Sequence, residues 1–194
     1  MCRRPFLSLP MGCVVLAATL TGCGQQNTDA AIASPTTVAS AAVGACKLLD
    51  HKEVQAVFPD AGAGVADDSR KQYGISACFW RTSRGTVAAQ FWSADGSSAK
   101  DEAAGLMLGA LDPLKGPAAR NNVRYENLAG IGEQAVAVVE TRDEQRGVID
   151  DFAMLVAQRG GQILVLTAPE LARSDRATAL AQLSALGKSA VNRL

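Results

Sequence analysis

Few side chains in this chain of 194 residues are suited to catalysis. His51 is the only histidine, so any Ser-His-Asp or Cys-His arrangement has to include it. It falls in the first turn of a predicted helix, beside Lys52 and Glu53, and the sequence contains no Gly-x-Ser-x-Gly elbow. We therefore interpret His51 as an exposed residue without a catalytic role. The sequence predicts no catalytic residue and no enzyme activity.

Two pairs of adjacent acids are the remaining candidates for acid–base chemistry or metal binding. Asp67 and Asp68 fall in a predicted loop that lacks the ligand spacing of an EF-hand. Asp150 and Asp151 fall in a predicted strand, where consecutive side chains face opposite sides and cannot share a substrate. Zinc sites draw on histidine and cysteine, which are scarce here. We therefore expect solvated charge at both pairs, and no metal and no cofactor.

Cys23 stands in a distinctive context near the start of the chain. Two arginines precede an apolar run over residues 6–20, which is shorter than a membrane-spanning helix requires. Thr21 and Gly22 follow as small residues before the thiol of Cys23. This stretch resembles the lipobox of bacterial lipoproteins. The resemblance implies that residues 1–22 are a lipoprotein signal peptide and that Cys23 carries diacylglycerol, with a fatty acid such as palmitate on its amine.

Lipidation of Cys23 would place the protein in the cell envelope, anchored to a bacterial membrane and facing the periplasm or the exterior. Each buried CH₂ contributes about 0.8 kcal/mol, so two or three acyl chains give stable anchoring. Gly24, and not the Asp that signals inner-membrane retention, follows the cysteine. We therefore expect the outer membrane in a Gram-negative cell. The alternative is an ordinary secretory peptide that contains Cys23 by chance.

The composition divides the remaining chain into a tether and one domain. Residues 23–45 are rich in Ala, Ser and Thr and contain no aromatic residue, which predicts a flexible tether averaging about 25 Å end to end. Residues 46–194 are enough for a single domain with a core. Loss of residues 1–22 removes two of 19 basic residues and none of 19 acidic ones. The resulting net charge near −2 argues against nucleic-acid binding.

The two cysteines of the predicted domain, Cys46 and Cys78, are expected to form a disulfide. The other three thiols leave with the signal peptide or take lipid, and an exported protein tends to pair those that remain. A metal pair and a redox pair are the alternatives, but the sequence has neither a CxxC motif nor a second ligand nearby. Trp80 follows Cys78 by two residues, so it is expected on the same strand face, covering the disulfide.

The pattern of apolar residues predicts an α+β fold. Asp50 and Glu53 form a capping box, and Leu49 and Val54 occupy the hydrophobic-staple positions, at the start of a short helix that ends at Pro59. Strand signals cover residues 75–82, 86–92, 123–128, 135–141, 148–158 and 163–167, and two further helices are predicted over 98–111 and 175–194. An antiparallel sheet of five or six strands with helices mainly on one face accounts for this order.

Glycines indicate turns and close approaches in the predicted fold. Gly105 and Gly109 have the spacing of a helix-packing motif, so the predicted helix is expected to pack closely on the sheet. Residues 130–132 (Gly-Ile-Gly) lack the third glycine of a dinucleotide-binding loop and predict a tight turn with positive φ. Residues 160–161 (Gly-Gly) suit a hairpin turn. Residues 142–147 form a charged hairpin tip, interpreted as solvated, with a contact surface as the alternative.

Three short motifs recur together in a known family. Residues 46–49 (Cys-Lys-Leu-Leu) precede a helix, residues 78–80 (Cys-Phe-Trp) carry the second cysteine, and residues 128–135 (Leu-Ala-Gly-Ile-Gly-Glu-Gln-Ala) precede a hairpin. The combination resembles a family of small, uncharacterised bacterial lipoproteins, across the whole predicted domain. Ile131 and Glu133 stand where the family pattern has Leu and Asp. The resemblance implies an envelope lipoprotein and brings no catalytic residues.

The sequence therefore predicts a noncatalytic, lipid-anchored envelope protein. We expect it to bind a protein or a cell-wall partner through sheet surface that the helices leave uncovered. One alternative is a carrier of a lipid or small apolar ligand, held between the helices and the sheet. The other is a hydrolase that uses His51 or one of the acidic pairs.

Overall fold

The computed structural model describes residues 44–93, 101, 104, 105, 107, 109, 123–143, 148 and 150–194. The predicted signal peptide and residues 23–43 of the predicted tether lie outside the described residues. The helices are α1 (His51–Val57) and α3 (Arg176–Val191), with short 3₁₀ turns η1 (Ala45–Lys47), η2 (Lys71–Tyr73) and η5 (Pro169–Arg173). The strands are β1 (Val65–Asp67), β2 (Ile75–Thr82), β3 (Gly85–Ser93), β4 (Tyr125–Asn127), β5 (Gln134–Glu140), β6 (Phe152–Arg159) and β7 (Gln162–Thr167).

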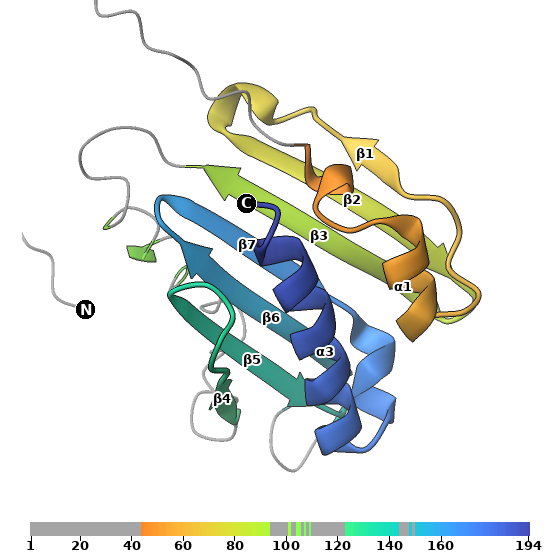
Figure 1. Ribbon diagram of the computed structural model, residues 1–194. Coiled ribbons are helices and arrows are strands. Elements are labelled where there is room, and N and C mark those ends of the chain that lie inside the picture. The colour runs from red at the N-terminus through yellow and green to blue at the C-terminus, as the bar shows by residue number, and fades with distance from the viewer. Residues whose placement is uncertain are drawn as a thin grey trace, which may run out of the picture. The chain divides into compact units, whose positions relative to one another are not determined.

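The seven strands form one sheet in the order β1-β2-β3-β7-β6-β5-β4, and every neighbouring pair is antiparallel (Figure 1). The predicted α+β class and antiparallel sheet are confirmed. The predicted number of five or six strands is wrong, because β1 adds a seventh. All three residues of β1 are exposed, so this edge strand has none of the apolar alternation by which a strand is recognised.

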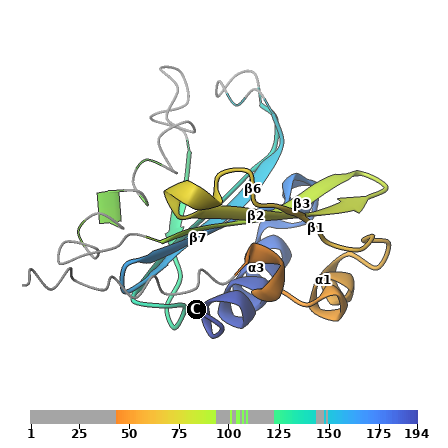
Figure 2. The same ribbon diagram turned by 90° about the horizontal axis from the view of Figure 1, so that it is seen from above.

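The helices α1 and α3 lie on the same face of the sheet (Figure 2), as the sequence predicts. Their apolar side chains and those of the facing strands form the larger core, which includes Trp80, Phe91, Leu155 and Leu183. A second, smaller cluster covers the opposite face of the central strands. There the side chains of the sheet pack with Met107 and Val123.

The start of α1 is built as its sequence predicts. The Asp50 side chain accepts a hydrogen bond from the Lys52 N–H, and the Asp50 N–H donates to Glu53 Oε2, each at 2.9 Å, which is the reciprocal arrangement of a capping box. The staple residues Leu49 and Val54 are both buried. Phe58, just before Pro59, terminates the helix. Local capping thus decides where this helix begins and ends.

Close packing of a helix on the sheet occurs at Gly187 of α3. A Cβ on Gly187 would lie 2.9 Å from Leu155 Cδ1, so a larger residue at this position would require Leu155 or the helix to shift. Close packing through Gly105 and Gly109 is a wrong prediction, because both are exposed with open space around them. Both are helical, and it is Met107 that packs on the sheet. The rest of that predicted helix lies outside the described residues.

Two predicted glycine turns are confirmed. Gly130 and Gly132 have φ of 74° and 61°, and a Cβ on Gly132 would lie 2.2 Å from the carbonyl oxygen of Gln158. Between them Ile131 is buried in the larger core. Gly160, with φ of 57°, opens the two-residue turn between β6 and β7.

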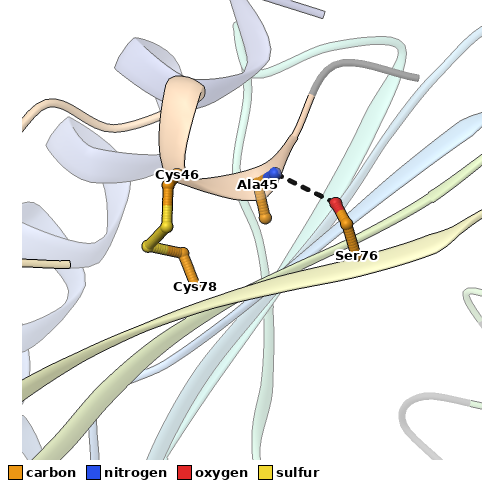
Figure 3. Close-up of a disulfide and its surroundings, with 4 residues drawn as sticks. All are labelled: Ala45, Cys46, Ser76 and Cys78. Carbon is orange, nitrogen blue, oxygen red and sulfur yellow. Dashed lines mark hydrogen bonds between the residues drawn. A yellow bond between two sulfur atoms is a disulfide. The ribbon is translucent and has the colours of Figure 1, made fainter. Parts of the chain in front are cut away.

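The disulfide between Cys46 and Cys78 joins η1 to β2 (Figure 3). Trp80 lies beside it: Trp80 Nε1 and Cys78 Sγ are both within 3 Å of the point that a Cβ on Gly64 would occupy. Ala45, the last residue of the predicted tether, is buried, and its N–H donates to Ser76 Oγ at 2.9 Å. Within the described residues, the first element of secondary structure, η1, thus begins at Ala45, one residue before the predicted start of the domain.

Candidate functional site

The structure keeps His51 and the first acidic pair apart from any assembled site. His51 is an exposed residue at the start of α1. Asp67 ends the edge strand β1 and so lies in a strand, not in the predicted loop, while Asp68 follows it. The Asp67 carboxylate accepts a hydrogen bond from the Ser69 N–H at 2.9 Å, and bonds from Ser69 lower the pKa of Asp67.

The antiparallel topology gathers several connections at one end of the sheet. The β2–β3 turn, the carboxyl end of β7 with η5, and the connection from β5 to β6 all lie at this end. The amino-terminal ends of β4 and α3 lie here as well, because Arg176 reaches the Arg124 and Val139 carbonyls. Segments that are about 90 residues apart in the chain therefore become neighbours.

A surface pocket of about 340 Å³ opens at this end of the sheet. We call it the arginine pocket, and define it by the seven residues that line it: Arg84, Arg142, Asp150, Asp151, Pro169, Glu170 and Arg173. These described residues bring three guanidinium groups and three carboxyl groups to the pocket. Arg142 belongs to the charged hairpin tip over residues 142–147, for which a contact surface is the alternative to a solvated tip. Residues 144–147 of that tip lie outside the described residues.

The second acidic pair lines this pocket, which corrects its predicted placement. The sequence places Asp150 and Asp151 in a strand over 148–158, with side chains facing opposite sides. In the structure β6 begins only at Phe152, and Val148 makes an isolated bridge to Asp143. Asp150 and Asp151 precede β6, and the Asp151 carboxylate accepts a hydrogen bond from the Arg142 N–H, so the period-two rule of a strand does not apply to the pair.

Asp151 is held by two partners on different elements. Its Oδ1 accepts from the Arg142 N–H at 2.9 Å, and its Oδ2 accepts from Arg173 Nε at 2.8 Å. The Arg142 hydrogen bond, followed by that of Arg173, lowers the pKa of Asp151. This ion pair fixes η5 against the β5–β6 connection and neutralises one acid and one arginine of the pocket.

Glu170 is satisfied on one oxygen only. Its Oε2 accepts a hydrogen bond from Thr82 Oγ1 at 3.2 Å, whereas its Oε1 is buried and accepts none from the described residues. A smaller adjoining cavity of about 130 Å³ shares Arg84 and Glu170 with the arginine pocket. Gln182 lines this smaller cavity, and its Oε1 is likewise buried without a donor among the described residues.

Arg84 lies between the two cavities, at the tip of the β2–β3 hairpin. The turn is held by its backbone: the Ser83 N–H donates to Asp60 Oδ2 at 2.7 Å and the Arg84 N–H to Thr82 Oγ1 at 3.3 Å. Hydrogen bonds from Ser83, and to a lesser extent the charge of Arg84, lower the pKa of Asp60. Within the described residues, no hydrogen bond or ion pair engages the Arg84 guanidinium.

A buried carboxylate supports the adjoining corner of the sheet. Glu140, at the end of β5, is almost fully buried and accepts from the Arg124 N–H at 3.0 Å. Arg176 Nη1 lies 3.9 Å from Glu140 Oε1 and donates to the Val139 carbonyl at 2.5 Å. These contacts fix the start of α3 against the end of β5, which is a structural role.

Among the described parts of the chain, neither α1 nor α3 lines a groove over β1 to β3, and sheet surface without a helix is where the sequence predicts a binding site. A groove of about 310 Å³ there is lined by Val65, Phe79, Arg81 and Thr86. Val65 is 62% exposed and pairs with Phe79 across the edge of the sheet. Its described lining residues bring one cation and none of the buried polar atoms that lack a partner, so they offer less directional chemistry than those of the arginine pocket.

Sequence reasoning missed Arg84, Glu170 and Arg173. A weak signal exists, since Arg84 lies in a predicted turn and Arg173 follows a predicted strand. That signal is insufficient without the strand order, because only the pairing of β3 with β7 brings the two segments to one place.

No family model matches the chain, and no curated protein or solved structure shows a significant similarity to it. Within the described part of the chain, no three His, Cys, Asp or Glu side chains are grouped so that they could hold a metal ion. Across that same part, no helix has the length and apolarity needed to cross a bilayer. The geometry of the arginine pocket is therefore the basis on which a function is inferred.

Proposed function

We propose that this protein is a noncatalytic, lipid-anchored component of a bacterial cell envelope that binds its partner, an envelope protein or a cell-wall component, through the arginine pocket. The observation that carries this proposal is the position of the pocket. It lies at the end of the sheet opposite to the point where the chain enters the domain.

The entry point is fixed by Ala45, which hydrogen-bonds Ser76 near the start of β2. Arg84 and the pocket lie beyond the other end of β2, whose last residue is Thr82. Six residues of extended strand from Ser76 to Thr82 span roughly 20 Å. A domain tethered through Gly44 would thus present the pocket away from its attachment, where a partner has access.

The charges of the pocket favour a partner that bears both signs. The described lining residues include three arginines and three acids, which sum to no net charge when all are ionised, so this described part of the pocket has no excess of the positive charge that nucleic acids require. The pair formed by Asp151 and Arg173 is internally neutralised at 2.8 Å. Among the described lining residues, Arg84 and Asp150 make no side-chain hydrogen bond or ion pair, and the buried oxygens Glu170 Oε1 and Gln182 Oε1 accept no hydrogen bond.

The two alternative functions receive less support. For a carrier, the space between the helices and the sheet is occupied by buried side chains, and Gly187 lies in close contact with Leu155. A hydrolase that uses His51 would need this residue at its active site. His51 lies at the start of α1 and is not among the residues that line the arginine pocket. Asp151 is engaged by two partners, which disfavours it as a general base.

The anchor is tested by the intact mass of the native protein. We expect cleavage before Cys23 and an added mass of diacylglycerol with or without a third acyl chain, and we expect Cys23→Ser to be released from membranes. An unmodified amino terminus on protein purified from membranes would overturn the lipid anchor.

The binding surface is tested by a photo-crosslinking amino acid placed at Arg84 or, as a control, at Tyr73. Tyr73 is 70% exposed and lies in η2, next to the start of β2 and thus at the other end of the sheet. In intact cells we expect discrete adducts from position 84 and none from position 73. Identical adduct patterns, or no adduct from position 84, would contradict the role of the pocket.

A further inference from the structure

We propose that the arginine pocket and its smaller neighbour bind a carboxylate whose α-carbon bears a nitrogen donor, as in a free α-amino acid or at the carboxyl end of a peptide. This inference rests on the proposed function, since it names the ligand chemistry of the same site. It follows from three residues that line the smaller cavity: Arg84, whose guanidinium makes no hydrogen bond or ion pair among the described residues, and Glu170 and Gln182, each with a buried oxygen that accepts no hydrogen bond there.

The first group is the guanidinium of Arg84. Among the described residues this guanidinium makes no ion pair. Two carboxylates are near it: Glu170 lines both cavities with Arg84, and Asp60 lines the smaller one. Asp60 is already bonded to the Ser83 N–H. A guanidinium presents paired N–H donors that match the two oxygens of a carboxylate, which makes this the natural ligand for Arg84.

The second group is a pair of buried acceptors. Glu170 Oε1 and Gln182 Oε1 are buried and accept no hydrogen bond from the described residues, and a buried oxygen without a donor is destabilising. An ammonium or amide N–H supplies such a donor. Water can also supply one, but water does not bring the carboxylate that Arg84 lacks.

The shape of the site restricts the size of the ligand. The smaller cavity of about 130 Å³ is walled by Val57, Phe58, Pro59 and Leu171 on its apolar side. It therefore suits a small alkyl side chain such as a methyl group. The arginine pocket, at about 340 Å³, leaves room for the carboxylate or for a preceding peptide unit.

The test is ligand-observed saturation-transfer NMR on the full-length lipidated protein in detergent. The probes are alanine, N-acetylalanine and alaninamide. Alaninamide keeps the nitrogen donors but has no carboxylate, so we expect it to bind at least about tenfold more weakly than the better of the other two. Alanine as the better ligand indicates a free amino acid, and N-acetylalanine as the better ligand indicates the carboxyl end of a peptide.

Variants assign the binding to the pocket. We expect Arg84→Gln to weaken binding of the better ligand about tenfold or more, and Gln182→Met, which removes one acceptor, to weaken it severalfold. Arg81→Gln is the matched control, since Arg81 is exposed on the same hairpin but lies outside both cavities. Its binding should equal that of the native protein.

The inference is overturned if neither carboxylate binds at millimolar concentration, if alaninamide binds equally well, or if Arg84→Gln has no effect. Crosslinks from position 84 that persist despite such a result would leave the proposed function intact and reject only this ligand chemistry. Conversely, loss of the crosslinks or of the lipid anchor with alanine binding retained would reject the proposed function alone.

Discussion

At the scale of single residues, Glu53 connects three parts of the chain. Its carboxylate accepts the Asp50 N–H of the capping box, Ser189 Oγ at 2.5 Å and the Arg193 guanidinium at 2.7 and 2.8 Å. The Arg193 hydrogen bond is the largest cause that lowers the pKa of Glu53, from 4.5 to about 2, while partial burial acts in the opposite direction. The pKa of Arg193 is raised by the same contact. The cap can be read from the sequence, whereas the partners 136 and 140 residues away cannot.

We predict that Glu53→Gln lowers the free energy of unfolding at pH 7 by about 1–2 kcal/mol, because it weakens charge-assisted hydrogen bonds on a partly solvated group. Since the pKa of Glu53 is lower in the folded state, the advantage of the native protein is complete above about pH 4.5 and is lost as the pH falls towards 2. Denaturant titrations of both proteins between pH 7 and pH 2.5 measure this.

Asp68→Asn is the control for Glu53→Gln. Asp68 is exposed, and its carboxylate makes no side-chain hydrogen bond among the described residues. A Glu53→Gln effect that is no larger than that of Asp68→Asn, or that does not diminish in acid, would show that the contact to Arg193 contributes little.

Two neighbouring glycines allow backbone strain and steric overlap to be separated. Gly130→Ala places a side chain at φ of 74° in open space, so we predict a loss of about 1 kcal/mol. Gly132→Ala adds an overlap with the Gln158 carbonyl, so we predict about 2–4 kcal/mol. Thermal and denaturant unfolding of both variants provide the comparison. Equal losses would mean that the turn moves away from β6 at no cost.

At the scale of elements, the approach of α3 to the sheet is set by its smallest residues. The buried positions of α3 include Ala179, Gly187 and Ala190 besides Leu183 and Leu186. Leu180, between two of these positions, is only partly buried. The helix packs through small residues because β6 presents Leu155 directly opposite Gly187.

We predict that Gly187→Ala destabilises the domain by about 1–3 kcal/mol, since its Cβ forces Leu155 or the helix to move. Gly105→Ala is the matched control, because Gly105 is also helical but has open space around it. There alanine should be neutral or stabilise by up to about 1 kcal/mol. Equilibrium unfolding distinguishes the two. Stabilisation by both substitutions would contradict the packing described for α3.

At the scale of the whole molecule, one antiparallel sheet connects every described part of the domain. Its central pairing, β3 with β7, joins residues that are about 70 to 80 positions apart in the chain. This pairing brings the β2–β3 turn, with Arg84, next to η5, with Glu170 and Arg173, and so creates the arginine pocket. The disulfide acts on the same scale, because it constrains the unfolded chain between Cys46 and Cys78.

We predict that reducing the disulfide lowers the free energy of unfolding by about 3–4 kcal/mol, the entropic value for a closed loop with a sequence separation of 32. Guanidinium titrations with and without a thiol reductant measure this, with the Cys46→Ala/Cys78→Ala double variant as the control that reductant should not affect. A midpoint that is unchanged on full reduction would show that packing around Trp80 holds this region without the covalent bond.

The sequence by itself determined the features that depend on neighbouring residues. These are the α1 capping box, most strand segments, the glycine turns at residues 130–132 and 160–161, and the pairing of the two remaining cysteines. Each follows from local backbone preference, from period-two burial or from a small number of possible partners.

Only the tertiary structure decided the remaining features. The strand β1 is exposed and so has no apolar pattern in the sequence. The close contact between a helix and the sheet is made by Gly187, and not by Gly105 or Gly109. Asp150 and Asp151 lie outside the strand and line a pocket. The pocket joins residues from the β2–β3 turn to η5, and which of these distant segments meet depends on strand order. Strand order is fixed by the free energy of burying both sheet faces together, which no local segment encodes.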